Sequence, residues 1–311
     1  MMRPRGAPHK RLADKSTGPR RHPAQHKVED PLPGPVDEAI APGHSVVGPA
    51  EEPESVSAEA VEVEAPGSLD GDLATPRNPR SLSGPPPRLV DERRLWRQGH
   101  HLVAGVDEVG RGAWAGPLSV GVAVMESAVM KLRSRRAPAG LRDSKLLPEE
   151  RREAIFERVG SWCAAWAIGH SDPEECDRLG MTAALRLATR RAFAALPPEA
   201  RPDAVVLDGN FDYVSPPAAP TLFDDEPPVC VPVVRTMIGA DARCASVAAA
   251  SVLAKVTRDR VMRDLAESFP PFDFDRNKGY PSPTHKRALC GYGMTAIHRR
   301  SWIFAEHLPW R

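Results

Sequence analysis

The sequence predicts an α/β fold, with a mixed central sheet flanked by helices and a helical C-terminal part. Three observations lead to this prediction. Apolar segments of strand length interleave with segments of helical periodicity from about residue 99 onward. The first two predicted strands follow one another closely, as in a hairpin, whereas helices precede and follow the third predicted strand. Residues 96–311 are enough chain to bury one hydrophobic core, so we expect a single folded domain there.

Five apolar stretches have the length and composition of β-strands. The first is His101–Val106, and Leu118–Met125, in which valine and glycine recur, is the expected hairpin partner. The remaining three are Trp162–Ile168, Asp203–Asp208 and Val229–Val234. A proline-rich segment, residues 214–228, separates the last two strands and predicts a surface loop.

The predicted helices lie between and after these strands. One opens at Pro148 and runs through Val159, and a short one opens at Pro173. Apolar residues at helical spacing predict another helix over Met181–Leu196. A long alanine-rich helix is expected over Asp241–Ser268, and short helices over Tyr280–Arg311.

Residues 1–95 are predicted to be a disordered tail, because proline, alanine and glutamate dominate and no apolar periodicity survives. The tail is polarised: residues 1–27 carry eight Lys/Arg and one acid, and residues 28–75 carry twelve acids and no Lys/Arg. Three interpretations stay open, namely a solvated extension, a basic arm that touches nucleic acid, and a transit peptide.

Bulk composition excludes several classes of protein. No stretch is apolar for the ~18 residues that a membrane span needs, so no membrane partner is expected. The five cysteines include no C-x-x-C pair, which argues against a zinc ribbon and a disulfide framework. We expect reduced thiols in a cytoplasmic protein, with a monomer as the default state.

The most informative string is GVDEVGRGAWAGP at 105–117. An apolar strand there delivers two adjacent acids, Asp107 and Glu108. Adjacent strand residues point to opposite faces, so both acids can meet one site only near a strand end or at a bend. A glycine-rich turn, Gly110-Arg111-Gly112, follows and lets the backbone approach a ligand closely.

Two further acids stand at the ends of predicted elements. Asp208 ends the strand in DAVVLDGN, and Asp241 precedes the long helix in IGAD. Clustered carboxylates repel one another unless a cation lies between them, and a set of oxygen ligands suits Mg²⁺ or Mn²⁺. Two such ions about 4 Å apart are a common device for attack on a phosphodiester.

Each acid also has an ordinary structural interpretation. Asp241 can be the N-cap of its helix, and Asp208 before a glycine can be a turn residue. Asp107 and Glu108 can be a solvated strand end. The presence of all four acids together with the Gly-Arg-Gly turn weakens these interpretations.

The motifs G-x-D-E-x-G-R-G at 105–112 and A-G-P at 115–117 resemble the opening motif of the ribonuclease HII family. The same family resemblance extends to the later segments of the chain over residues ~99 to 303, in matching order and spacing. These segments are DSK at 143–145, LDG at 207–209, DARCASVAAASVLAKVTRDR at 241–260, KGYPSPTH at 278–285 and HRRSW at 298–302.

The resemblance implies a ribonuclease H-like fold and a site of four metal-binding carboxylates, Asp107, Glu108, Asp208 and Asp241. It implies an endonuclease that cuts the RNA strand of RNA–DNA hybrids and single ribonucleotides in duplex DNA, and leaves 5′-phosphate and 3′-hydroxyl ends.

The resemblance also implies the residues that contact substrate. Backbone of Gly110, Arg111 and Gly112, with Tyr280, would read the 2′-hydroxyl that distinguishes RNA from DNA. Lys145 and Arg243 are expected phosphate contacts, with an ordinary surface charge as the alternative for each. The family frequently has lysine where Arg243 stands, and arginine keeps the charge but not the geometry.

Two other functions are weighed against this one. A different nuclease of the same fold, such as a DNA resolvase, would be indifferent to the 2′-hydroxyl. A non-enzymatic protein that binds nucleic acid through its basic arm would lose function without residues 1–95. His285 and His298 are expected to be structural or near the substrate, since cleavage by histidines would not need four carboxylates.

Overall fold

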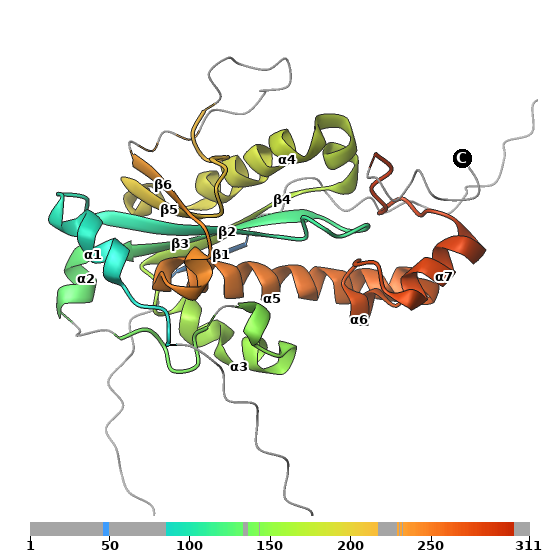
Figure 1. Ribbon diagram of the computed structural model, residues 1–311, viewed down its shortest axis with the longest axis horizontal. Coiled ribbons are helices and arrows are strands. Elements are labelled where there is room, and N and C mark those ends of the chain that lie inside the picture. The colour runs from blue at the N-terminus through green and yellow to red at the C-terminus, as the bar shows by residue number, and fades with distance from the viewer. Residues whose placement is uncertain are drawn as a thin grey trace, which may run out of the picture. The chain divides into compact units, whose positions relative to one another are not determined.

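A computed structural model describes residues 46–49, 85–132, 136–142, 144–216, 229, 231 and 233–301 (Figure 1). Its centre is a six-stranded sheet in the order β1-β4-β3-β2-β5-β6. The strands are β1 Val46–Pro49, β2 Leu102–Val109, β3 Leu118–Glu126, β4 Ala165–Ser171, β5 Ala204–Asp208 and β6 Val233–Met237.

The sheet is mixed, as predicted. β2 and β3 form the expected antiparallel hairpin, and β4 and β1 continue the antiparallel side. On the other side β5 pairs in parallel with β2, and β6 in parallel with β5. The β2–β5 register pairs Val106 with Leu207, so the residues that follow them, Asp107 and Asp208, are neighbours at one edge of the ladder.

Helices cover both faces of this sheet (Figure 1). Helix α4 packs on the face formed by β3 and β4, and α5 packs on β2 and β3 from the opposite face, with α3 outside it. The helices are α1 Val90–Arg97, α2 Ser127–Leu132, α3 Glu149–Gly160, α4 Pro173–Ala195, α5 Ala245–Ser268, α6 Phe274–Asn277 and α7 Pro283–Tyr292. Short 3₁₀ helices are η1 Ser144–Leu146, η2 Pro198–Ala200, η3 Ala240–Ala242 and η4 Pro270–Phe272.

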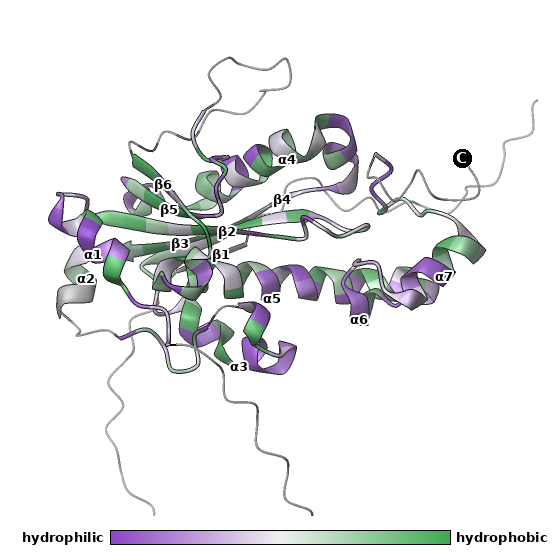
Figure 2. Ribbon diagram, in the orientation of Figure 1, coloured by the Kyte–Doolittle hydropathy of each residue, from purple (hydrophilic) through white to green (hydrophobic). Residues whose placement is uncertain are grey.

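The core consists of the two apolar layers between the sheet and these helices. Figure 2 shows hydrophobic residues along the central strands, and hydrophilic residues frequent on α1. Helix α5 lies so close to the sheet that a Cβ on Gly105 would come within 2.2 Å of the Ser246 backbone. A Cβ on Gly121 would likewise lie 2.6 Å from the Ala250 carbonyl oxygen. The glycines of β2 and β3 and the alanines of α5 therefore bring the helix that faces the site next to the strands.

The positions of several elements differ from the prediction. The predicted strand Trp162–Ile168 is wrong at its start, because the Trp162 amide donates to Val159 O in the turn after α3 and β4 begins at Ala165. The last strand runs over Val233–Met237 and not 229–234, because proline, which lacks an N–H, stands at position 232. The two helices predicted around Pro173 and Met181 are confirmed, because α4 consists of two helical segments that meet at Gly180, whose backbone is not helical (φ 75°, ψ 168°).

The predicted end of the tail at residue 95 is also wrong. Helix α1 lies across that boundary, and its Leu95 side chain is fully buried. Strand β1, which also falls within the predicted tail, pairs with β4. The rest of the tail, Asp143 of the DSK segment, residues 217–228 of the predicted loop and residues 302–311 lie outside the described residues.

Two expectations from composition can be compared with the described part of the chain. The four cysteines described there, Cys163, Cys176, Cys244 and Cys290, are free thiols. No helix in that part is both long and apolar enough to cross a bilayer.

Candidate active site

Two of the predicted acids meet because of strand pairing. Asp107 lies near the end of β2 and Asp208 is the last residue of β5, and the parallel register places them side by side. Asp107 is only 5% exposed, and its carboxylate accepts a hydrogen bond from the Glu108 amide at 2.9 Å. A buried carboxylate at this edge is therefore fixed by the sheet itself.

The third acid, Asp241, comes from the 3₁₀ helix η3 and is 2% exposed. Gly239 adopts a left-handed conformation (φ 68°) just before it, which turns the chain back from β6. The Ala240 amide then donates to Asp208 Oδ1 at 2.7 Å, which ties η3 to the end of β5. The N-cap of α5 is Cys244, so the interpretation of Asp241 as that cap is wrong.

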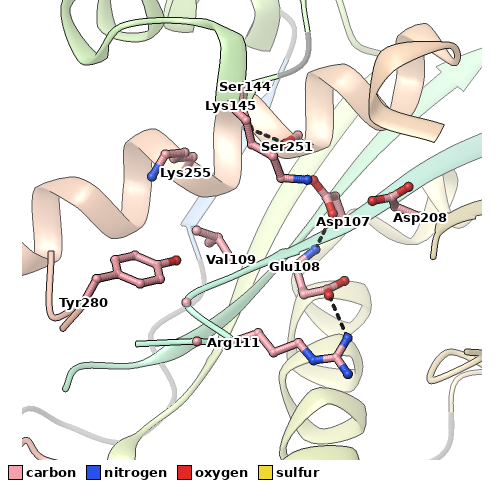
Figure 3. Close-up of a pocket in the computed structure, with 12 residues that line it drawn as sticks. Asp107, Glu108, Val109, Arg111, Ser144, Lys145, Asp208, Ser251, Lys255 and Tyr280 are labelled. Atoms are coloured by element: carbon pink, nitrogen blue, oxygen red, sulfur yellow. Dashed lines mark hydrogen bonds and ion pairs between the residues drawn. The ribbon is translucent and has the colours of Figure 1, made fainter. Parts of the chain in front are cut away.

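These three carboxylates form a cluster whose oxygens lie within 4.8 Å of one another. Glu108 is adjacent in sequence but its carboxylate turns away, as Figure 3 shows. It accepts the Tyr213 hydroxyl at 3.0 Å and lies 3.5 Å from Arg111 Nη1. The carboxylates of Asp107 and Glu108 point in different directions because neighbouring residues of β2 face opposite sides of the sheet. The structure brings together three of the four predicted ligands, with Glu108 beside them.

Negative charge is concentrated here in a buried place. The pKa of Asp107 is raised to about 8, mainly by burial and also by the nearby charges of Glu108, Asp208 and Asp241, against a hydrogen bond from Ser251 that lowers it. A cluster that disfavours its own ionisation in this way is stabilised by a bound cation.

The cluster opens onto a pocket of about 320 Å³. Most of the residues expected to contact substrate line it (Figure 3). The lining comprises Asp107, Glu108, Val109, Gly110, Arg111, Gly112, Ser144, Lys145, Asp208, Ser251, Lys255 and Tyr280. One pocket thus holds three of the four predicted acids, Asp107, Glu108 and Asp208, together with the Gly-Arg-Gly turn and the tyrosine.

Of the two predicted cationic contacts, one lies in the pocket and the other lies outside it. Lys145 Nζ lies 3.3 Å from Asp241 Oδ2, and its side chain is 72% exposed, so it can reach both the carboxylates and a ligand. Arg243 is exposed and does not line the pocket; its carbonyl accepts the Arg88 amide. Gly112 faces the tyrosine, because a Cβ there would lie 3.9 Å from Tyr280 Cε1.

Comparison with known proteins agrees with this geometry. The sequence profile of the family named Ribonuclease HII matches residues 104–305. The chain belongs to the ribonuclease HII family. The family assignment makes it a hydrolase, an endoribonuclease of the ribonuclease H type.

Individual relatives cover most of the chain. It is 47% identical to ribonuclease HII of Streptomyces avermitilis over 228 residues, which are 73% of this chain and 88% of the relative. It is 40% identical to ribonuclease HII of Thermus thermophilus over 223 residues, 71% of this chain and 95% of the relative.

Solved structures support the ribonuclease H-like fold. Ribonuclease H2 of Pyrococcus horikoshii superimposes with a TM-score of 0.51 at 29% identity, over 66% of this chain and 96% of that one. Ribonuclease HII of Archaeoglobus fulgidus, solved in complex with PCNA, gives a TM-score of 0.50 at 25% identity, over 67% of this chain and 97% of that one.

Sequence analysis missed several residues of this ribonuclease HII pocket. Ser144 and Ser251 face each other with hydroxyl oxygens 2.7 Å apart, and Ser251 bonds to Asp107. Lys255, one helical turn after Ser251 on α5, also lines the pocket, and burial lowers its pKa. The spacing of these two residues within the long helix was the available signal, since positions i and i+4 share a face.

The two histidines lie outside the pocket lining. His285 and His298 are buried, with their Nε2 atoms 2.9 Å apart, and they pack among Phe272 and Phe274. His285 Nδ1 lies 2.9 Å from the Tyr280 carbonyl oxygen. Their place in an apolar cluster supports a structural role next to a pocket residue.

Proposed function

We propose that this protein is an endonuclease that hydrolyses the RNA strand of RNA–DNA hybrids and incises duplex DNA at single ribonucleotides. The observation that carries the proposal is that one pocket combines two members of the carboxylate cluster, Asp107 and Asp208, with the Gly110–Gly112 turn and Tyr280. All of these groups belong to one chain, which supports action as a monomer.

The donor set suits a divalent ion that prefers oxygen ligands, Mg²⁺ or Mn²⁺. Asp107, Asp208 and Asp241 would hold it, and Glu108, which lines the same pocket, would complete a site for two ions with substrate bound. Ions held there would supply activation of a water and stabilisation of the charge on the leaving oxygen. Attack by water, with the 3′-oxygen as leaving group, yields 5′-phosphate and 3′-hydroxyl ends.

The chain's own residues bind and orient the substrate. The Gly-Arg-Gly backbone has no side chain at two of its three positions, so a sugar can approach its amide groups closely. A 2′-hydroxyl both donates and accepts hydrogen bonds, and Tyr280 supplies a ring against the neighbouring sugar. We therefore assign discrimination of RNA from DNA to this wall of the pocket.

Cationic side chains neutralise the substrate phosphates. Lys145, Lys255 and Arg111 line the pocket, and the Arg111 side chain is 61% exposed. Arg243 stands outside, so a contact from it would be to a phosphate beyond the cut site. Phosphate contacts of this kind fix register and add affinity without reading sequence.

The test uses a labelled DNA duplex with one ribonucleotide and an otherwise identical all-DNA duplex. Incision at the ribonucleotide alone with Mn²⁺ or Mg²⁺, and none with EDTA, is the expected result. Incision of both duplexes would indicate a general nuclease, and binding without incision would indicate a non-enzymatic protein. Asp264→Asn, an exposed acid of α5, is the matched control for substitutions of the clustered acids.

A further inference from the structure

Two arginines behind the pocket are fully buried. Arg258 on α5 and Arg299 near the C-terminal end of the described chain each have 0% exposed surface. Removing a guanidinium from water is costly unless its donors are satisfied. Both side chains donate hydrogen bonds to backbone carbonyls next to one wall of the pocket. This wall, which we propose faces the sugar, consists of Gly110–Gly112 and Tyr280.

Arg258 joins the two halves of that wall. Its Nε donates to Pro117 O at 2.8 Å and its Nη2 to Ala115 O at 3.1 Å, both in the segment after the Gly-Arg-Gly turn. Its Nη1 donates to Lys278 O at 2.9 Å, in the segment that leads into Tyr280.

The Arg258 guanidinium also contacts both halves of this wall, the Gly-Arg-Gly turn and Tyr280, directly. Its carbon lies 5.6 Å from the centre of the Tyr280 ring. A Cβ on Gly110 would come within 2.3 Å of Arg258 Nε, so the turn lies directly against this side chain. One rigid group therefore touches the turn and the tyrosine together.

Arg299 holds the turn itself. Its Nη1 donates to Gly110 O at 2.7 Å, and its Nε and Nη2 both donate to Gly116 O, at 3.1 and 2.9 Å. The C=O of Gly110 and the N–H of Arg111 belong to one trans peptide and point in opposite directions. The bond from Arg299 thus directs the Arg111 amide away from the buried side.

The two wall segments are also bonded to each other at a point of close approach. Trp114 N donates to Gly279 O at 2.8 Å, and a Cβ on Gly279 would lie 2.3 Å from Ala115 O. Only glycine fits there, at a φ of +81°. The separation between turn and tyrosine therefore depends on backbone contacts that the arginines hold in place.

We propose that Arg258 and Arg299 are positioning residues that set the spacing and amide orientation of the 2′-hydroxyl-reading wall, Gly110–Gly112 and Tyr280. This inference rests on the proposed function. Arginine suits the task because its planar fork donates in several fixed directions at once, whereas lysine is a single point charge on a flexible stem. Neither arginine lines the pocket, so their effect on the reaction passes through the wall.

The test for Arg258 is a double-mutant cycle on kcat/KM with the single-ribonucleotide duplex and Mn²⁺. Arg258→Lys keeps the charge and should lower kcat/KM about ten-fold, because it loses the coupling to Tyr280. In the Tyr280→Ala background the same substitution should cost no more than about two-fold. Arg260→Lys, on the same helix and ion-paired with Glu153, is the control and should change neither background.

The test for Arg299 measures binding in the Asp107→Asn background, which removes cleavage. The ratio of affinities for ribonucleotide and all-DNA duplexes reports reading of the 2′-hydroxyl. Arg299→Lys should lower this ratio about five-fold and leave affinity for the all-DNA duplex unchanged. A uniform loss on both duplexes would overturn the role of Arg299.

If Arg258→Lys lowers kcat/KM by the same factor in the Tyr280→Ala background as in the parent, the two residues are not coupled. That result would overturn the role of Arg258. Thermal melting of each variant separates these outcomes from loss of fold. If the parent protein neither incises nor discriminates the ribonucleotide, the proposed function fails instead, and the arginine variants are not the cause.

Discussion

The carboxylate of Asp107 lies beside that of Asp208 because Val106 pairs with Leu207 in the parallel ladder of β2 and β5. This pairing places two carboxyl groups side by side at one edge of the sheet, where Asp107 is buried and Asp208 half-buried. The raised pKa of Asp107, about 8, is the electrostatic consequence of that burial and crowding.

Asp107→Asn is expected to abolish incision while the protein stays folded and still binds substrate. The amide keeps the size of the carboxyl group and is neutral, as is the protonated acid that a pKa of about 8 favours at pH 7, so the metal-free variant should melt close to the parent. Cleavage assays with Mn²⁺, gel-shift binding and thermal melting measure the three effects. Full activity in this variant would contradict the assignment of the site, and Asp264→Asn should behave as the parent.

Lys255→Met should weaken binding of the substrate duplex by removing a phosphate contact from the pocket. Each such contact contributes about one unit to the slope of log affinity against log salt, so that slope should fall by about one. Binding titrations at several salt concentrations give the slope. Arg158→Met, an exposed cation on α3 outside the pocket, is the matched control. Equal slopes for Lys255→Met and the parent would show that Lys255 makes no phosphate contact.

The fold and the positions of the carboxylates could be predicted from the sequence, because each depends on a local pattern of residues. Val103 and Val106 of β2 and Val205 and Leu207 of β5 mark buried strands, and each strand ends in acids. Parallel strands place their carboxyl ends at one edge, so the meeting of Asp107 and Asp208 follows from the topology.

Other features depend on contacts that the sequence does not display. Helix α1 has few apolar residues, and its place in the fold depends on Leu95 and on the hydrogen bond that Glu92 accepts from the Ser246 amide, far along the chain. The orientation of Glu108 depends on Tyr213, 105 residues away. Long-range contacts of this kind have no local signature, and the buried arginines behind the pocket were missed for the same reason.

Glu92→Gln is expected to stabilise the protein at neutral pH. Glu92 Oε1 accepts Ser246 N at 2.9 Å and Ser246 Oγ at 2.6 Å, and its Oε2 has no partner among the described residues. Burial raises the pKa of Glu92 above 4.5. The folded state then favours the protonated form, so stability is present at low pH and is lost as pH rises from 4.5 toward the folded pKa.

Glutamine keeps the bonds to Ser246 and stays neutral at every pH. The gain of Glu92→Gln over the parent should therefore grow from pH 5 to pH 8 and reach at least about 1 kcal/mol. Urea unfolding across this range measures it. Glu92→Ala, which loses both bonds, should be less stable than the parent at every pH. A constant difference between Glu92→Gln and the parent would rule out the raised pKa.

Gly105→Ala should destabilise the protein strongly, because its Cβ would lie 2.2 Å from the Ser246 backbone and force α5 off the sheet. Overpacking of this kind costs about 1–3 kcal/mol or more. Gly291→Ala in α7 is the matched control, since no atom lies within 4 Å of its Cβ, and it should gain up to about 1 kcal/mol. Thermal melting of the two variants should shift in opposite directions, and a shift in the same direction would contradict the close packing of α5.

The buried histidine pair gives a stability effect of the opposite sign to Glu92. Thr295 N donates to His298 Nδ1 at 3.0 Å, so the proton of neutral His298 is on Nε2, which faces His285 Nε2. His285 must then carry its proton on Nδ1, which donates to Tyr280 O. A proton added to His298 Nδ1 would face an amide N–H, and burial with nearby positive charge lowers the pKa of His298 to about 3.

Because the folded pKa lies below the unfolded value, stability is present above pH 6.5 and is lost as pH falls from there toward 3. The parent should therefore lose about 1–2 kcal/mol more between pH 7 and pH 5 than His298→Gln, which has no such proton to take up. At pH 7 the variant should be the less stable protein, since it replaces a well-bonded ring. Unfolding at both pH values measures the difference, and parallel losses in the two proteins would mean that His298 is not held neutral by the fold.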